Sequence, residues 1–389
     1  MLPILILSFA TFTLGLAIKQ EPLLINSDRY QGLKSDVTTL KHEGFRLIST
    51  TPSNNEWLSE RDILALYQSK TRFIDRTDQD LESLVYLPPP SRFTPPSKAT
   101  HQKTVLPLLD TISTDKLEDW LTKFTSFHTR YYQSTTGKEA AEFLYDLGVQ
   151  LSRAASPTVK LTPIKFKHDW EQFSVILRLE AVVAPAGENE PVVILSAHSD
   201  SINQWNPWWG RAPGAEDDGS GCATIFEVLR ILIESKFIPS RPIEFHFYSA
   251  EEAGLLGSQK VAASYKQRQI DVAGVYHADE TGYTPKGKVP VIGVSQDYVD
   301  EELEGFLVVL LKEYVKGVDI VKTECGYACS DHASWTEAGY SATYLFDTRM
   351  EDGPEFVHGS GDTVSKISFE HMSRFVKLGL AFAVEMSLA

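Results

Sequence analysis

The sequence lacks most of the features that would place the chain outside the ordinary globular proteins. It has 3 cysteines among 389 residues, too few for a fold held together by many disulfide bonds. It also lacks an excess of positive charge, because 52 acidic residues outnumber 37 basic ones and leave a formal net charge of -15. We therefore expect no nucleic-acid partner, since binding a phosphate backbone needs basic patches. The acidity by itself indicates only solubility.

Long apolar runs are also missing, except at the start of the chain. Residues 1–17, MLPILILSFATFTLGLA, are too few to span a bilayer comfortably, and they end in the small-x-small pattern Gly15-Leu16-Ala17. This pattern is typical of a secretory signal peptide, although the basic residues that usually precede the apolar run are absent. We predict a secreted, extracellular protein with no membrane partner, and a membrane anchor is the alternative.

The spacing of the few cysteines fits an oxidising compartment. Cys325 and Cys329 stand four apart in CGYAC, and we predict a small disulfide between them. Cys222 follows a Gly-Ser-Gly turn and enters an apolar segment, which indicates a buried free thiol.

Changes in composition divide the chain after the signal peptide. Residues 18–87 are polar and mixed, and Ser59 with Asp62 forms a capping box before an amphipathic helix. Residues 88–99 are rich in proline and have no periodicity, as in an exposed linker open to proteolysis. We predict a propeptide at 18–87, a tether at 88–99 that can be cut, and a catalytic domain at 100–389. The alternative is a small accessory domain on a stiff spacer.

The catalytic part alternates between strand and helix patterns. Thr136 and Glu139 form a second capping box before a helical pattern, and the C-terminal segment is a long helix with an apolar stripe. This order predicts an α/β fold, a three-layer sandwich with a central, mostly parallel mixed sheet, beside the small N-terminal prodomain. The alternation at 174–183 predicts a strand, and short apolar runs predict further strands at 191–197, 242–250, 272–278, 290–294 and 341–347.

Side chains that bind metals follow several of these strands. Sites in open α/β sheets form at the carboxyl ends of the strands, and seven His, Asp and Glu residues lie at such ends or in nearby loops. Three imidazole or carboxylate ligands per ion are usual for a catalytic zinc site that stays open to water. The seven are enough for two ions that share one carboxylate, with one glutamate left over as a base, which indicates metal-assisted hydrolysis of a peptide bond. They are His198, Asp200, Asp217, Glu251, Glu252, Asp279 and His358.

Each of these residues also has an ordinary structural explanation. A lone histidine after a strand is more often structural, and acidic residues before a helix can simply favour its dipole. The pair His198 and Asp200 favours a site, because residues two apart in an extended chain point the same way. The carboxylate can then hold the second ring nitrogen, as metal-bound histidines commonly require.

Five segments of the sequence, in this order, resemble the M28 family of co-catalytic zinc aminopeptidases: HSDS, APGAEDDGSG, YSAEEAGLLGS, CGYACSDHASW and VHGSGDT. The likeness is strongest to the secreted fungal leucine aminopeptidases. It covers most of residues 100–389 and extends more weakly to the segment before the tether. One departure is Glu216, at a position where bacterial members carry Asp.

The resemblance implies a ligand set for two Zn²⁺ ions per chain. His198 and Asp279 would be the terminal ligands of one ion, and Glu252 and His358 those of the other. Asp217 would bridge both ions, and the peptide bond that follows it would be cis.

The resemblance also implies three residues that act on the reaction. Asp200 would orient the histidine at the end of its strand. Glu251 would be the general base and later the general acid. Tyr327, held on the clip between Cys325 and Cys329, would donate a hydrogen bond to the oxyanion.

The function implied is that of a secreted, monomeric metallo-exopeptidase that removes N-terminal apolar residues, preferably leucine, from peptides with a free amino terminus. We expect Ile292, Tyr298 and Phe346 to line the pocket for the residue that is removed. Two other classes are a single-zinc glutaminyl cyclase on the same fold and a binding domain that has lost its metals. The complete set of candidate ligands argues against both.

Overall fold

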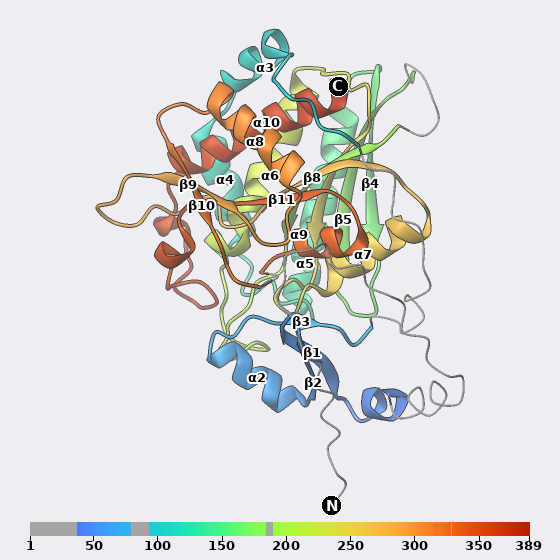
Figure 1. Ribbon diagram of the computed structural model, residues 1–389, viewed down its shortest axis with the longest axis vertical. Coiled ribbons are helices and arrows are strands. Elements are labelled where there is room, and N and C mark those ends of the chain that lie inside the picture. The colour runs from blue at the N-terminus through green and yellow to red at the C-terminus, as the bar shows by residue number, and fades with distance from the viewer. Residues whose placement is uncertain (1–36, 79–92, 184–189, 328) are drawn as a thin grey trace, which may run out of the picture. The chain divides into compact units, whose positions relative to one another are not determined.

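The computed structural model describes residues 37–78, 93–183 and 190–389, apart from residue 328 (Figure 1). The chain divides into two compact units, Met1–Tyr86 and Leu87–Ala389. The signal peptide predicted at 1–17 lies outside the described residues, as does the part of the predicted tether before residue 93.

The described part of the N-terminal unit is a helical segment at residues 37–42, followed by a small antiparallel sheet on which the helix Glu60–Gln68 packs. Its sheet has the order β2-β1-β3, and the apolar side chains of Ile48, Ile63 and Phe73 form its core. The predicted capping box is confirmed, because the side chain of Ser59 accepts the N–H of Asp62 and the carboxylate of Asp62 accepts the N–H of Ser59. The elements are β1 (Arg46–Thr51), β2 (Asn54–Leu58), α2 (Glu60–Gln68) and β3 (Ile74–Asp75).

The second unit is built on an eight-stranded mixed sheet in the order β10-β9-β11-β8-β6-β7-β5-β4. The four central strands β11, β8, β6 and β7 run parallel, whereas β5 and β4 on one side, and β9 next to β11 on the other, pair antiparallel. The strands are β4 (Val159–Phe166), β5 (Ser174–Ala181), β6 (Val192–His198), β7 (Ile243–Tyr248), β8 (Val272–Ala278), β9 (Val291–Ser295), β10 (Asp319–Thr323) and β11 (Ala342–Phe346).

Helices cover both faces of this sheet, which confirms the predicted α/β sandwich (Figure 1). Strand β6 is buried at every position, because it has a helical layer on each side. None of the described helices is long and apolar enough to cross a membrane. One face carries α3 (Gln102–Leu109), α4 (Thr114–Phe124), α5 (Thr135–Ala154), α6 (Gly221–Glu234), α8 (Glu301–Tyr314) and α10 (Phe369–Leu388), and the other carries α7 (Leu256–Gln267) and α9 (His332–Ala338).

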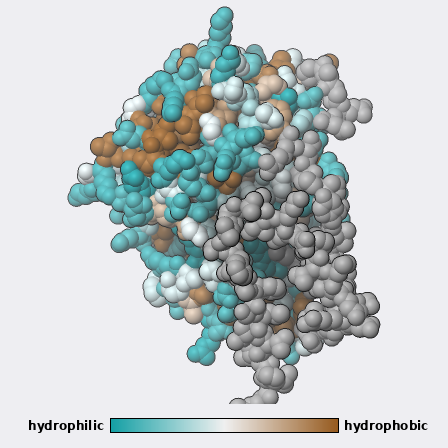
Figure 2. Space-filling model, in the orientation of Figure 1, coloured by the Kyte–Doolittle hydropathy of each residue, from teal (hydrophilic) through white to brown (hydrophobic). Residues whose placement is uncertain are grey.

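The visible surface is mostly polar, with one region where apolar side chains gather around α8 and the loop that carries Val289 (Figure 2). Val289 is 73% exposed, and Val308 and Val309 of α8 are partly exposed. The remaining large apolar side chains of α8 face the core.

The start of α5 differs from the predicted one. Its N-cap is Ser134, whose side chain accepts the N–H of Gly137 at 2.9 Å, so the helix begins at Thr135. Thr136 does not cap it, because its hydroxyl donates to the carbonyl of Thr129 at 2.6 Å. The predicted capping box was therefore wrong.

The described end of the predicted tether packs on the second unit. Phe93 lies against the main core, and the guanidinium of Arg241 lies 4.7 Å from its ring centroid. A few residues later, the N–H groups of Thr100 and His101 donate to the buried carboxylate of Glu385 in α10, at 2.9 and 3.0 Å. The contacts of the described part of the second unit therefore begin before residue 100, at Phe93.

Candidate metal centre

The carboxyl ends of the central strands bring the predicted residues together. Strand β6 ends at His198, β7 is followed by the turn that carries Glu251, and β8 is followed by Asp279. Because β7, β6 and β8 are parallel neighbours, these ends meet at one edge of the sheet. Asp217 lies in the turn before α6, and His358 comes from the loop after β11.

Asp217 lies between the two histidines. Its Oδ1 is 2.9 Å from Nε2 of His198, and its Oδ2 is 2.8 Å from Nε2 of His358. Burial alone would raise the pKa of Asp217, but the imidazoles of His358 and His198 hold it well below its ordinary value. The peptide bond between Asp217 and Asp218 is cis, as the resemblance implied. One oxygen of this carboxylate therefore faces each imidazole, which is the arrangement that a bridging ligand needs.

Two groups of potential ligands share this carboxylate. His198, Asp217 and Asp279 offer ligand atoms that all lie within 4.8 Å of one another, and so do Asp217, Glu252 and His358. Oδ1 of Asp279 lies 3.5 Å from Nε2 of His198, and Oε2 of Glu252 lies 3.2 Å from Nε2 of His358. In the described parts of the chain these are the two groups that can hold a metal ion.

The donor atoms are of the types that bind zinc, and some of them are buried without a hydrogen-bond partner. They include Oε1 of Glu252 and Oδ1 of Asp279. A buried polar atom left in this way costs about 1–3 kcal/mol, so something else is expected to bind it. Imidazole nitrogens and carboxylate oxygens, three to an ion, are the usual ligands of catalytic zinc.

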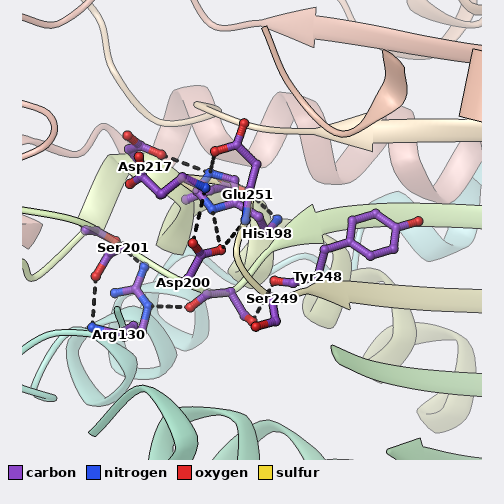
Figure 3. A network of polar contacts seen from close by, with 12 residues as sticks. Arg130, His198, Asp200, Ser201, Asp217, Tyr248, Ser249 and Glu251 are labelled. Carbon is purple, nitrogen blue, oxygen red and sulfur yellow. Dashed lines mark hydrogen bonds and ion pairs between the residues drawn. The ribbon is translucent and has the colours of Figure 1, made fainter. Parts of the chain in front are cut away.

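Asp200 joins the histidine at the end of β6 to the glutamates after β7 (Figure 3). Its Oδ1 lies 3.4 Å from Nδ1 of His198, the ring nitrogen turned away from the other ligands. The same carboxylate accepts the N–H of Glu251 at 3.0 Å and that of Glu252 at 3.2 Å. The side chain is fully buried, so these contacts hold it in one orientation.

The adjacent glutamates point to different places. Glu252 reaches His358, whereas Oε2 of Glu251 lies 4.0 Å from Nε2 of His198, and its side chain keeps 12% of its surface exposed. Burial raises the pKa of Glu251 well above its ordinary value, the imidazole of His198 opposes this, and the carboxylates of Asp331 and Asp279 add to it. A carboxylate whose pKa is raised in this way accepts a proton more readily than an ordinary glutamate.

The predicted disulfide is confirmed. Cys325 and Cys329 are bonded with an S–S distance of 1.98 Å, and Tyr327 between them is 6% exposed. The ring of Tyr298 meets that of Tyr327 edge to face, with 6.2 Å between centroids. The predicted free thiol is also confirmed, because Cys222 is buried and donates to the carbonyl of His198.

The predicted pocket lining is wrong for one residue. Ile292 has no exposed surface and belongs to the main core, so it cannot line an open pocket. Phe346 is 2% exposed and lies at the end of β11. Alternation along a strand shows which residues are buried but not which of them border a cavity.

Sequence reasoning missed the buried carboxylates that hold the backbone of the ligands. Asp362 accepts the N–H of Asp217 at 3.1 Å, and Asp218 accepts the N–H of His198 at 3.1 Å. Both lie inside segments that carry the family resemblance, so the sequence contained a weak signal. Their partners, however, are 145 and 20 residues away along the chain, and no local pattern indicates them.

Comparison with known proteins decides the family. Residues 180–383 match the model of peptidase family M28. The leucine aminopeptidase 1 of Aspergillus niger is 38% identical over 389 residues, which is 95% of this chain and 94% of that protein. The chain belongs to peptidase family M28. It is therefore a member of a family of enzymes that hydrolyse peptide bonds, and its candidate metal centre lies where the fold gathers the strand ends.

Solved structures agree with this M28 assignment. LapB from Legionella pneumophila superposes with a TM-score of 0.76 at 30% identity, covering 91% of this chain and 98% of that one. The glutaminyl cyclase of Bacteroides thetaiotaomicron has a TM-score of 0.56 at 16% identity, covering 70% of this chain and 97% of that one. The second likeness shows a shared fold alone.

Proposed function

We propose that this M28 peptidase is a secreted zinc aminopeptidase that removes apolar N-terminal residues, preferably leucine, from peptides. The observation that carries the proposal is the position of Asp217, with one carboxylate oxygen at 2.9 Å from His198 and the other at 2.8 Å from His358. Two ligand groups that share one carboxylate support two zinc ions per chain. The names of the relatives support the preference for leucine.

The residues around the centre support a hydrolytic mechanism. When bound, zinc supplies Lewis acidity, which lowers the pKa of water and polarises the carbonyl that is attacked. Glu251 accepts the proton of the attacking water and returns it to the leaving amine. The hydroxyl of Tyr327 donates a hydrogen bond to the oxyanion that develops. Asp200 holds the ring of His198 and the backbone of Glu251, so the ligand and the base keep a fixed distance.

The carboxylates of the centre support cleavage at the amino terminus. Those of Asp217, Glu251, Glu252 and Asp279 surround one small region. Two zinc ions would neutralise most of their charge, but the carboxylate oxygens still accept hydrogen bonds, and the free amino group of a peptide supplies more N–H donors than an interior amide. We infer that the enzyme is an exopeptidase for this reason.

We further propose that residues 1–17 direct secretion and that the N-terminal unit with its tether is a propeptide. The disulfide between Cys325 and Cys329 supports an oxidising compartment. Because Phe93 packs on the core of the catalytic unit, the cut that would release the propeptide is placed before Phe93.

The decisive experiment measures zinc content and turnover of leucine-p-nitroanilide for the wild type and for Glu251→Ala, with Glu251→Gln as the matched variant of equal size. The variants should keep their zinc and lose nearly all turnover, because the ligands remain and the base is gone. A rate within about tenfold of the wild type would exclude Glu251 as the base, since general bases contribute about 10²–10⁴-fold. A zinc content near one together with cyclisation of N-terminal glutamine would favour the cyclase instead.

A further inference from the structure

Arg130 is a fully buried arginine in the connection between α4 and α5, and it lies below Asp217 and Asp200 in the view of the candidate metal centre (Figure 3). Such a residue is unusual, because arginine is almost never buried unless it is paired. No carboxylate of the described segments lies within salt-bridge distance of its guanidinium. Its partners are main-chain carbonyls instead, and the aromatic ring of Phe124, whose centroid lies 4.3 Å from the guanidinium carbon.

The three carbonyls come from two different loops. Nε of Arg130 donates to the carbonyl of Ser199 at 2.9 Å, and this loop directly follows the ligand His198. Nη2 donates to the carbonyl of Gly214 at 2.9 Å, and Nη1 donates to that of Pro213, in the loop that leads to Asp217. One side chain therefore holds both the loop that follows His198 and the loop that leads to Asp217.

The main chain of the same residue adds a fourth link. The N–H of Arg130 donates to the hydroxyl of Ser201 at 3.0 Å, and that hydroxyl donates to the carbonyl of Ala212 at 2.9 Å. Ser201 follows the first loop, and Ala212 precedes the second. Backbone and side chain of Arg130 thus join the same two segments.

The second loop is shaped to admit the guanidinium. Gly214 has φ +54°, and a Cβ atom there would lie 2.7 Å from Nη2 of Arg130. Any larger residue would push against the guanidinium or against the carbonyl of Asp217, which would be 2.5 Å away. The close approach explains why glycine occupies this position.

We propose that Arg130 is a positioning residue that fixes the His198 loop against the Asp217 loop, so that one aspartate can reach both histidines. Only arginine carries N–H donors in a rigid planar fork, and a lysine ammonium cannot reach three carbonyls in fixed directions. The consequence for catalysis rests on the proposed function, but the consequence for metal binding does not.

The test compares Arg130→Lys, which keeps the charge and loses the fork, with the wild type. Arg241→Lys is the matched control, because Arg241 also donates to a main-chain carbonyl, that of Met386 at 3.2 Å. It lies just before β7, at the end of that strand opposite to Glu251. The affinities for the first and second zinc ion are measured in full-length protein by competition with a chromophoric chelator, and kcat and KM are measured at saturating zinc.

Arg130→Lys should weaken the binding of zinc by about 10- to 100-fold and lower kcat more than it changes KM, whereas Arg241→Lys should leave the zinc affinities unchanged. A lower unfolding temperature with unchanged zinc affinities and unchanged kcat would show a merely structural role and overturn the proposal. If Arg130→Lys does not fold, Gly214→Ala places a Cβ atom 2.7 Å from Nη2 and forces the guanidinium out of its position between the loops. Unchanged zinc affinity in that variant would overturn the proposal equally.

The two proposals can fail separately. Zinc affinity is measured without substrate. A wild type that does not hydrolyse leucine-p-nitroanilide would therefore contradict the proposed function, while the zinc affinities would still test the role of Arg130. A wild type that hydrolyses it, with equal zinc affinities in all variants, would contradict only the role of Arg130.

Discussion

The hydroxyl of Ser330 donates a 2.6 Å hydrogen bond to Oδ2 of Asp279, which leaves Oδ1 of that carboxylate as the oxygen that faces His198. The hydroxyl of Ser330 also lies 2.7 Å from Nε2 of His277, whose Nδ1 lies 2.9 Å from the hydroxyl of Ser196. An ionised carboxylate can only accept hydrogen bonds. Ser330 must therefore donate to Asp279, which requires Nε2 of His277 to carry a proton and donate it to Ser330.

The surroundings of His277 agree with a neutral ring. Burial lowers the pKa of His277 to about 3, so near pH 7 the ring carries one proton. That proton lies on Nε2, and Nδ1 accepts the hydroxyl proton of Ser196. His277 is thus not a candidate ligand itself. It supports the candidate ligand Asp279 through the hydroxyl of Ser330.

From this chain of hydrogen bonds we predict that Ser330→Ala weakens zinc binding at one of the two proposed sites, the one that includes Asp279. Without its partner on Oδ2, the carboxylate of Asp279 can turn away, and we expect the zinc affinity at that site to fall about tenfold while the other site is unaffected. Competition with a chelator measures both affinities. Ser152→Ala is the control, because the hydroxyl of Ser152 contacts only a carbonyl within α5. Equal losses in the two variants would contradict this reading.

Tyr327→Phe should lower kcat for leucine-p-nitroanilide by about 10²-fold, because one donor to the oxyanion is lost. The zinc content should not change, since the hydroxyl is not among the candidate ligands. Tyr145→Phe in α5 serves as the control, because it removes a tyrosine hydroxyl far along the chain from the candidate centre. If Tyr327→Phe keeps full kcat, the hydroxyl does not stabilise the oxyanion.

We predict that Glu244 makes the free energy of unfolding depend on pH in the acid range. Burial alone would raise its pKa, but the hydrogen bonds of His246 and Tyr265 and the charge of Arg178 lower the pKa to about 2, from an ordinary value of 4.5. Because the pKa is lower in the folded state than in the unfolded state, ionised Glu244 stabilises the fold at pH values above 4.5. This contribution is lost as the pH falls from 4.5 toward 2. The gap corresponds to about 3 kcal/mol.

The prediction is checked with the metal-free protein and with Glu244→Gln, by urea unfolding at several pH values. The wild type should be the more stable protein at pH 7, and its advantage should shrink between pH 4.5 and pH 2. An advantage that stays constant over this window would mean that Glu244 does not titrate as described.

Cutting the chain between residues 79 and 92 should raise the rate on leucine-p-nitroanilide, if the N-terminal unit is a propeptide that restrains the enzyme. Purified full-length and cut proteins are compared at equal zinc content. Equal rates would remove the idea of an inhibitory propeptide and leave the unit as an accessory domain.

The sheet shows where sequence reasoning succeeds and where it fails. The six strands with short apolar runs were predicted, because burial on both faces leaves a visible pattern. Strands β4 and β10 were not predicted. They form the two edges of the sheet, where several positions are exposed and the apolar pattern is interrupted, in β4 by Pro163 and in β10 by Asp319 and Lys322.

The site divides in the same way. The residues that converge on the candidate centre could be predicted, because each follows a strand or lies in a segment with a family likeness. Apart from Asp200, the residues that hold them could not be predicted. Arg130 reaches a carbonyl 69 residues away, and Ser330 meets Asp279 across 51 residues, so nothing near either of them in the sequence indicates the partner.

The most direct test counts the zinc ions bound per chain in the wild type, in Glu252→Ala and in Asp217→Ala. With Asp217 as the shared ligand, we expect two ions in the wild type, one in Glu252→Ala, and the loss of tight binding at both sites in Asp217→Ala. A wild type that binds a single ion, or an Asp217→Ala variant that still binds two, would contradict the dinuclear centre.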